Sequence, residues 1–63
     1  MEASELLKEF KRINSSVEVI EYEVGDTNDP VPALDDFWLK VTTKHHEWLH
    51  VYVNRDSKRL EWY

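Results

Sequence analysis

The chain has 63 residues, no cysteine and a formal net charge of −5 at pH 7. A chain of this length forms one domain, residues 1–63, and buries only about 60% of the surface that the unfolded form exposes. The lack of cysteine excludes a disulfide framework, and the histidine spacing is not that of a zinc site, so we expect no metal and no cofactor. Aromatic packing or oligomerisation is then the expected source of stability.

The charge is distributed unevenly along the chain. Residues 1–36 include ten acidic and three basic residues, whereas residues 37–63 include three acidic and five basic ones. The N-terminal part is therefore strongly acidic, which disfavours nonspecific binding to DNA.

Residues 2–14 predict an amphipathic helix. Its apolar residues recur at spacings of three, four and seven and are Ala3, Leu6, Leu7, Phe10 and Ile13. Glu2 and Glu5 stand where a signal peptide would begin its basic region and apolar run. We therefore expect neither export nor a membrane span, and we take the cytoplasm as the location.

Residues 17–24 predict the first strand, since they are mainly β-branched and aromatic. The apolar positions change parity between Val19 and Ile20, which leaves two interpretations open. Either the strand contains a bulge, or only Ile20, Tyr22 and Val24 mark its buried face. Residues 25–36 contain the only glycine and both prolines and predict a long loop, without the ligand spacing of an EF-hand.

Three more strands follow, and matching their apolar faces sets the register. A three-residue turn that pairs Thr43 with Glu47 also makes the pairs Val41/Leu49, Leu39/Val51, Phe37/Val53, Trp38/Tyr52 and Lys40/His50. A second turn within residues 54–58 places Leu60 and Trp62 on the face of Val51. The prediction is an α+β fold, in which an N-terminal helix packs on a four-stranded antiparallel meander sheet. Ile20, Tyr22 and Val24 are expected to complete the surface on which the helix lies.

Two segments resemble a known family. The helix is followed by Val-Glu-Val-Ile-Glu-Tyr at residues 17–22, and residues 51–60 read Val-Tyr-Val-Asn-Arg-Asp-Ser-Lys-Arg-Leu. This order resembles PepSY-type modules and, more broadly, the cystatin-like arrangement of a helix wrapped by a meander. The resemblance implies the same fold and, for PepSY modules, a role in regulating proteases.

The sheet face opposite the helix, here called the outer face, is expected to lack a cover because the chain has one helix. The binding residues expected on this face are Trp38, Lys40, Trp48, His50, Tyr52, Arg59 and Tyr63, with Glu61 beside them. The aromatic residues could simply form cross-strand pairs that stiffen the sheet. They could also form an apolar patch of the size that marks an interface, and Trp, Tyr and Arg are enriched at binding hot spots.

We therefore expect a small non-enzymatic protein-binding module that acts as an inhibitor or adaptor, including the type that phages encode. It would form a homodimer or small oligomer, through this face or an edge strand, or bind another protein. The alternative is a nucleotide or single-stranded nucleic acid whose bases stack on the aromatic rings while Lys40, His50 and Arg59 contact phosphates. An enzyme is not expected, because the sequence has no recognisable nucleophile or oxyanion donor set and predicts no catalytic residue.

Overall fold

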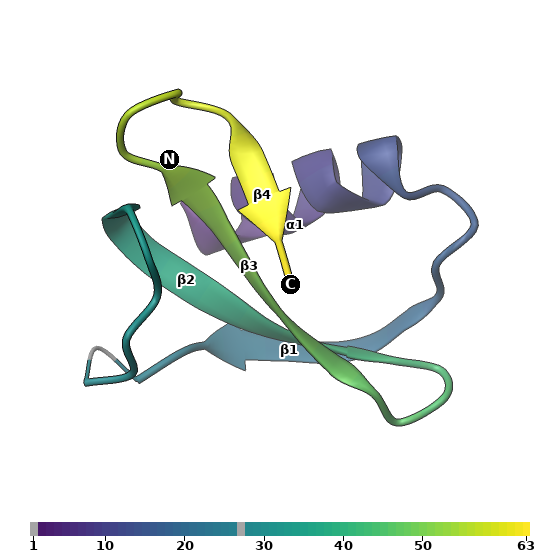
Figure 1. The fold of residues 1–63 in the computed structure, drawn as a ribbon. Helices are drawn as coiled ribbons and strands as arrows, with labels where there is room; N and C mark the ends of the chain where they lie inside the picture. Colours follow the sequence, from purple (N-terminus) through teal and green to yellow (C-terminus); the bar gives the residue numbers. More distant parts are fainter. Residues whose placement is uncertain (1, 27) are drawn as a thin grey trace.

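One helix and four strands make up the computed structural model, which describes residues 2–26 and 28–63 (Figure 1). The elements are α1 (Ala3–Ile13), β1 (Val19–Val24), β2 (Leu34–Thr43), β3 (Trp48–Asn54) and β4 (Leu60–Trp62). The strands form one antiparallel sheet in the order β1-β2-β3-β4, and α1 lies behind it in Figure 1. The predicted α+β fold is confirmed. In the part of the chain that the structure describes, no helix has the length and apolar character needed to cross a membrane.

Helix α1 buries one apolar stripe and ends at a side-chain cap. Leu6, Leu7 and Phe10 are its buried residues, and Lys11 and Arg12 lie in its last turn. Asn14 ends the helix: its backbone N–H donates to the Phe10 carbonyl at 2.9 Å and its Nδ2 to the same oxygen at 3.2 Å. These bonds satisfy a carbonyl that the helix itself leaves without a partner.

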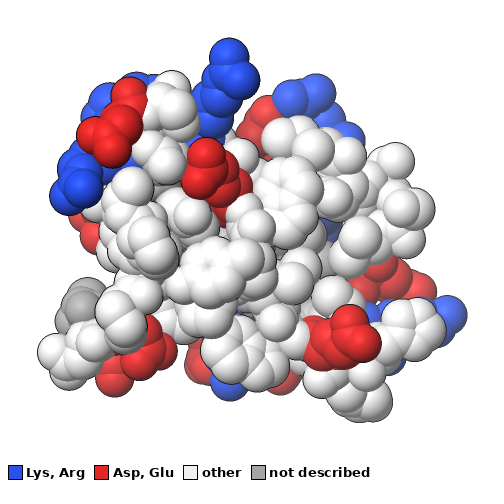
Figure 2. All heavy atoms as spheres, in the orientation of Figure 1, with Lys and Arg blue, Asp and Glu red and all other residues white. Residues whose placement is uncertain are grey.

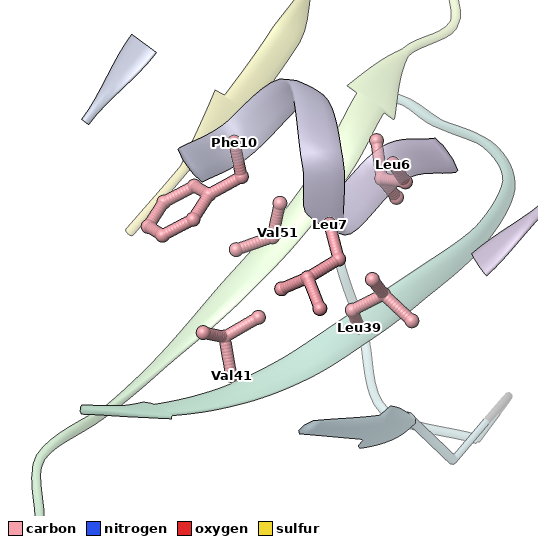
Figure 3. Packing of buried hydrophobic residues seen from close by; sticks show 6 residues of the cluster. All are labelled: Leu6, Leu7, Phe10, Leu39, Val41 and Val51. Atoms are coloured by element: carbon pink, nitrogen blue, oxygen red, sulfur yellow. The ribbon is translucent and has the colours of Figure 1, made fainter. Parts of the chain in front are cut away.

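The core lies between α1 and the central strands. Figure 3 shows the helix residues pointing at the sheet residues in one cluster, which consists of Leu6, Leu7, Phe10, Leu39, Val41 and Val51. Phe10 also meets Trp62 of β4 edge to face, with ring centroids 5.7 Å apart and planes at 87°. Burial of these side chains is the main stabilising contribution in a domain of this size.

Both hairpins have the predicted register except at one end of the first, where a shift between Leu34 and Trp38 means that Phe37 does not pair with Val53 as predicted. Val41 pairs with Leu49 and Leu39 with Val51 in the first hairpin, and Val51 pairs with Trp62 in the second. Each turn contains a bulky residue in the left-handed region, His46 with φ 62° and Lys58 with φ 60°. Such a backbone is costly for a residue with a Cβ atom, so side-chain matching between the strands is what sets the register.

Strand β1 contains a bulge, which was one of the two interpretations that the sequence left open. A register shift between Val19 and Glu21 marks the bulge, and Val19 packs against the core. Tyr22 pairs with Val41 and Val24 with Leu39, so both lie on the helix side of the sheet. The prediction that they support the helix is wrong, because α1 packs mainly over β3 and β4. Ile20, Tyr22 and Val24 are instead 51%, 44% and 58% exposed.

Candidate functional site

The loop between β1 and β2 covers half of the outer face. Sequence predicted a loop over residues 25–36, of which Thr27 lies outside the described residues, and β2 in fact begins at Leu34. Trp38 and Tyr52 are only 2% and 6% exposed, and they form a second cluster with Val31 and the partly buried Leu34. The expectation of an uncovered face is therefore wrong for these two aromatic residues.

Hydrogen bonds hold the loop on the Trp38 ring. The Gly25 N–H donates to the Trp38 carbonyl at 2.8 Å, and Trp38 Nε1 donates to the Asp26 carbonyl at 2.9 Å. The loop therefore buries the apolar surface of the indole and also accepts the hydrogen bond from its N–H. Val31, an apolar residue between two prolines, was the sequence signal that this loop packs on the sheet.

The other half of the outer face remains open. It carries an aromatic patch, defined here as Trp48, His50 and Tyr63, in which Trp48 is 47% and Tyr63 is 51% exposed. The His50 ring stacks on Tyr63 with centroids 4.3 Å apart and planes at 9°, and lies 4.7 Å from Trp48. His50 also lies 4.6 Å from buried Trp38, so the patch continues the covered cluster.

Backbone pairing fixes the position of Tyr63 beside β3. The His50 N–H donates to the Tyr63 carbonyl at 2.8 Å, and the Tyr63 N–H donates to the His50 carbonyl at 3.1 Å. The ring of Tyr63 also meets that of Tyr52 edge to face, with centroids 6.1 Å apart and planes at 82°. Backbone pairing and these ring contacts thus hold Tyr63 beside His50 and Tyr52.

Most charged groups lie away from the patch, and Lys40 contacts it. Figure 2, which views the outer face, shows uncharged surface across its middle and most Lys, Arg, Asp and Glu side chains toward its margins. Lys40 Nζ lies 5.1 Å from the centroid of the Trp48 ring, in the geometry of a cation–π contact. On β1, Glu23 is paired with Lys40. The basic character expected around the rings is therefore small.

Glu61 connects β4 to the covered cluster. Its Oε1 accepts hydrogen bonds from the Tyr52 hydroxyl and from Asn54 Nδ2, each at 3.2 Å. Burial of Tyr52, followed by its hydrogen bond to Glu61, raises the pKa of Tyr52 above its ordinary value of 10.0. Tyr52 therefore has a structural role in this arrangement.

Arg59 was predicted on the outer face but does not lie there. It is exposed and lines a hollow on the helix side of the sheet together with Leu6, Glu9 and Ile13. Because the second turn ends at this position, the alternation counted from β4 does not extend to it. The structure thus brings together Trp48, His50, Tyr63 and Lys40, and it buries Trp38 and Tyr52 beneath the loop.

The geometry gives no basis for a catalytic assignment. Ser16, His45 and Glu47 line one open hollow at the end of the first hairpin, but no hydrogen bond among the described residues joins their side chains. Within residues 2–26 and 28–63, no group of three or more His, Cys, Asp or Glu side chains could hold a metal ion.

The likeness to PepSY-type and cystatin-like modules remains a prediction. It is based on the order of elements and on the two segments quoted above. No protein-family model, curated protein or solved structure was found that matches this chain.

Proposed function

We propose that this chain is a small non-enzymatic protein-binding module whose aromatic patch binds a second copy of the chain. The observation that supports this most is that Trp48 and Tyr63 are half exposed and yet already held in place by His50. Rigid aromatic side chains supply large contact area and lose little conformational entropy on binding. An adaptor or inhibitor role, including the type that phages encode, would follow if this patch covered a surface of another protein.

Self-association also suits the size of the domain. The helix-side core consists of six buried side chains, and the second cluster adds three. A domain with so small a core gains stability from a partner that binds only the folded form, because binding shifts the equilibrium by mass action. His50 and Tyr63 stack on each other within the patch, and Lys40 lies at its Trp48 side, so two copies can bring these rings together while the Lys40 ammonium stays at the margin of the contact.

The test measures mass in solution for two matched variants. Trp48→Ala removes a patch residue that is 47% exposed, and Tyr22→Ala removes a residue that is 44% exposed on the helix side. By light scattering at about 100 μM protein, we expect a dimer for the unsubstituted chain and for Tyr22→Ala, and a monomer for Trp48→Ala. A monomeric unsubstituted chain, or equal effects of the two substitutions, would refute self-association through the patch.

A single-stranded nucleic acid is the alternative ligand for the same rings. Among the described residues Lys40 is the Lys or Arg side chain at the patch, since Arg59 lies on the other side of the sheet, and the acidic Glu23 stands opposite Lys40 in the strand register. One phosphate contact supports only weak, strongly salt-dependent binding. Binding of an oligothymidylate that is lost in Trp48→Ala and falls steeply with salt would favour this alternative.

A further inference from the structure

Strand β1 is an edge of the sheet, and its free side has hydrogen-bonding groups to offer. In an antiparallel ladder, pairs with and without mutual hydrogen bonds alternate. The Gly25 N–H donates to the Trp38 carbonyl, so Glu23 and Glu21 are the next residues whose backbone groups point toward β2. The N–H and C=O groups of Tyr22 and Val24 therefore point away from β2, toward the open edge.

Apolar and acidic side chains of this edge lie on opposite sides of the sheet. Tyr22 and Val24 lie on the helix side of the sheet and are 44% and 58% exposed, because α1 does not cover them. Glu21 and Glu23 lie on the outer side and are exposed as well. Natural edge strands are commonly protected by charged side chains, above all Lys, by Pro or by a bulge. Glu21 and Glu23 give this edge a negative charge, which repels acidic strands and not basic ones. Here the bulge precedes Glu21, which leaves residues 21–24 regular and without lysine or proline.

We propose that residues 21–24 of β1 bind an extended segment of a partner protein as a fifth strand, and that this segment alternates basic and apolar residues. Strand addition of this kind draws affinity from the backbone and specificity from alternate side chains. Strand β2 already shows the required pattern on the other side of β1: Lys40 is opposite Glu23, Val41 is opposite Tyr22 and Leu39 is opposite Val24. The partner segment repeats that pattern on the free side.

Charge argues against a second copy of β1 as the occupant. A two-fold antiparallel pair of β1 strands keeps the two outer faces on the same side, so the Glu21 and Glu23 side chains of both copies come together. Like charges at neighbouring cross-strand positions are destabilising. The N-terminal 36 residues, with ten acidic and three basic residues, add to this repulsion and attract a basic segment.

The experiment uses the whole chain and two synthetic peptides of equal length, in which valine alternates with lysine or with glutamate. Binding is measured by NMR titration at about 0.15 M salt, where exposed charges farther apart than about 8 Å are largely screened. We expect the lysine peptide to bind and to slow hydrogen exchange of the Tyr22 and Val24 amides, and the glutamate peptide not to bind. Equal binding of the two peptides, or unchanged exchange at both amides, would overturn the proposal.

Two double variants separate a specific strand contact from general attraction. Glu21→Gln with Glu23→Gln removes the charges of the edge, and Glu2→Gln with Glu5→Gln removes two exposed charges near the start of α1. We expect affinity for the lysine peptide to fall about tenfold in the first and less than about twofold in the second. Equal losses in the two variants would contradict the proposal. So would slower exchange of the Tyr22 and Val24 amides when the concentration of the protein alone is raised, because that result would indicate pairing of two β1 strands.

The outcome is independent of the aromatic patch. Tyr63→Ala is expected to bind the lysine peptide with unchanged affinity, because Tyr63 pairs with His50 beside β3 and β2 separates β3 from β1. Loss of peptide binding in that variant would place the contact on the patch and overturn the proposed edge site.

Discussion

Gly25 lies against the Trp38 ring so closely that a single methyl group is expected to displace the loop. A Cβ atom built on Gly25 would overlap Cε2, Cζ2 and Cδ2 of the indole at separations below 3.0 Å. The φ angle of Gly25 is not positive, so the need for glycine here is one of space and not of backbone conformation. Gly25→Ala should therefore force the Trp38 ring out of its place.

The cost of that displacement can be added from the contacts involved. Forcing an extra methyl group into a packed site costs about 1 to 3 kcal/mol. Moving the ring also breaks the bond from Trp38 Nε1 to the Asp26 carbonyl, worth about 1 kcal/mol. The total is about 2 to 4 kcal/mol, against a free energy of unfolding on the order of 3 to 9 kcal/mol for a chain of this length. We expect the melting temperature to fall by roughly 10 to 30 °C.

The assay is thermal unfolding in a double-mutant cycle. Gly25→Ala is measured alone and in a Trp38→Leu background, where the ring that the methyl group would meet is gone. In that background we expect the second substitution to cost less than about 1 kcal/mol, so that most of the penalty is a coupling between the two residues. An unchanged melting temperature for Gly25→Ala, or the same cost in both backgrounds, would refute the packing of the loop on Trp38.

The remaining predictions concern the core and alkaline pH. Phe10→Ala and Leu39→Ala should each cost on the order of 2 to 5 kcal/mol because both side chains are fully buried, whereas Ile13→Ala, at a position 45% exposed, should cost less than half as much in chemical denaturation. Because the Tyr52 pKa is raised in the folded state, its contribution is complete below about pH 10, where the unfolded chain still holds the proton, and is lost as pH rises through the folded-state value. Tyr52→Phe should therefore show a shallower loss of stability above pH 10 than the unsubstituted chain, and an identical slope would contradict the raised pKa.

The helix and the two hairpins could be predicted because residues close together in the sequence determine them. Apolar spacing defines α1, and matching of alternate residues selects one register for each turn length. The pairs Leu39/Val51 and Val51/Trp62 follow from that rule and are observed. A one-residue change in the first turn would have placed Val41 opposite Trp48, and one in the second turn would have placed Arg59 and Glu61 on the helix side.

The covered half of the outer face could not be derived in the same way. Val31 between the two prolines was the one signal of this packing, but whether a loop folds back on a sheet depends on contacts outside regular pairing, here Val31 and Gly25 with Trp38. A loop with glycine and two prolines predicts a break in regular structure but not the direction of the chain after it. The exposure of Tyr22 and Val24 has the same origin, since alternation gives their face but not which strands the helix covers.

The left-handed residues in both hairpin turns have a consequence for how the chain folds. At His46 and Lys58 the turn conformation costs about 1 to 2 kcal/mol more than it would with glycine, so neither turn favours its own closure. We expect the hairpins to form late, after collapse of α1 onto β3 has brought the strands together, and the folding transition state to contain little turn structure. Lys58→Gly should then slow unfolding while leaving the folding rate nearly unchanged, and an accelerated folding limb in the chevron plot would instead place this turn in the folding nucleus.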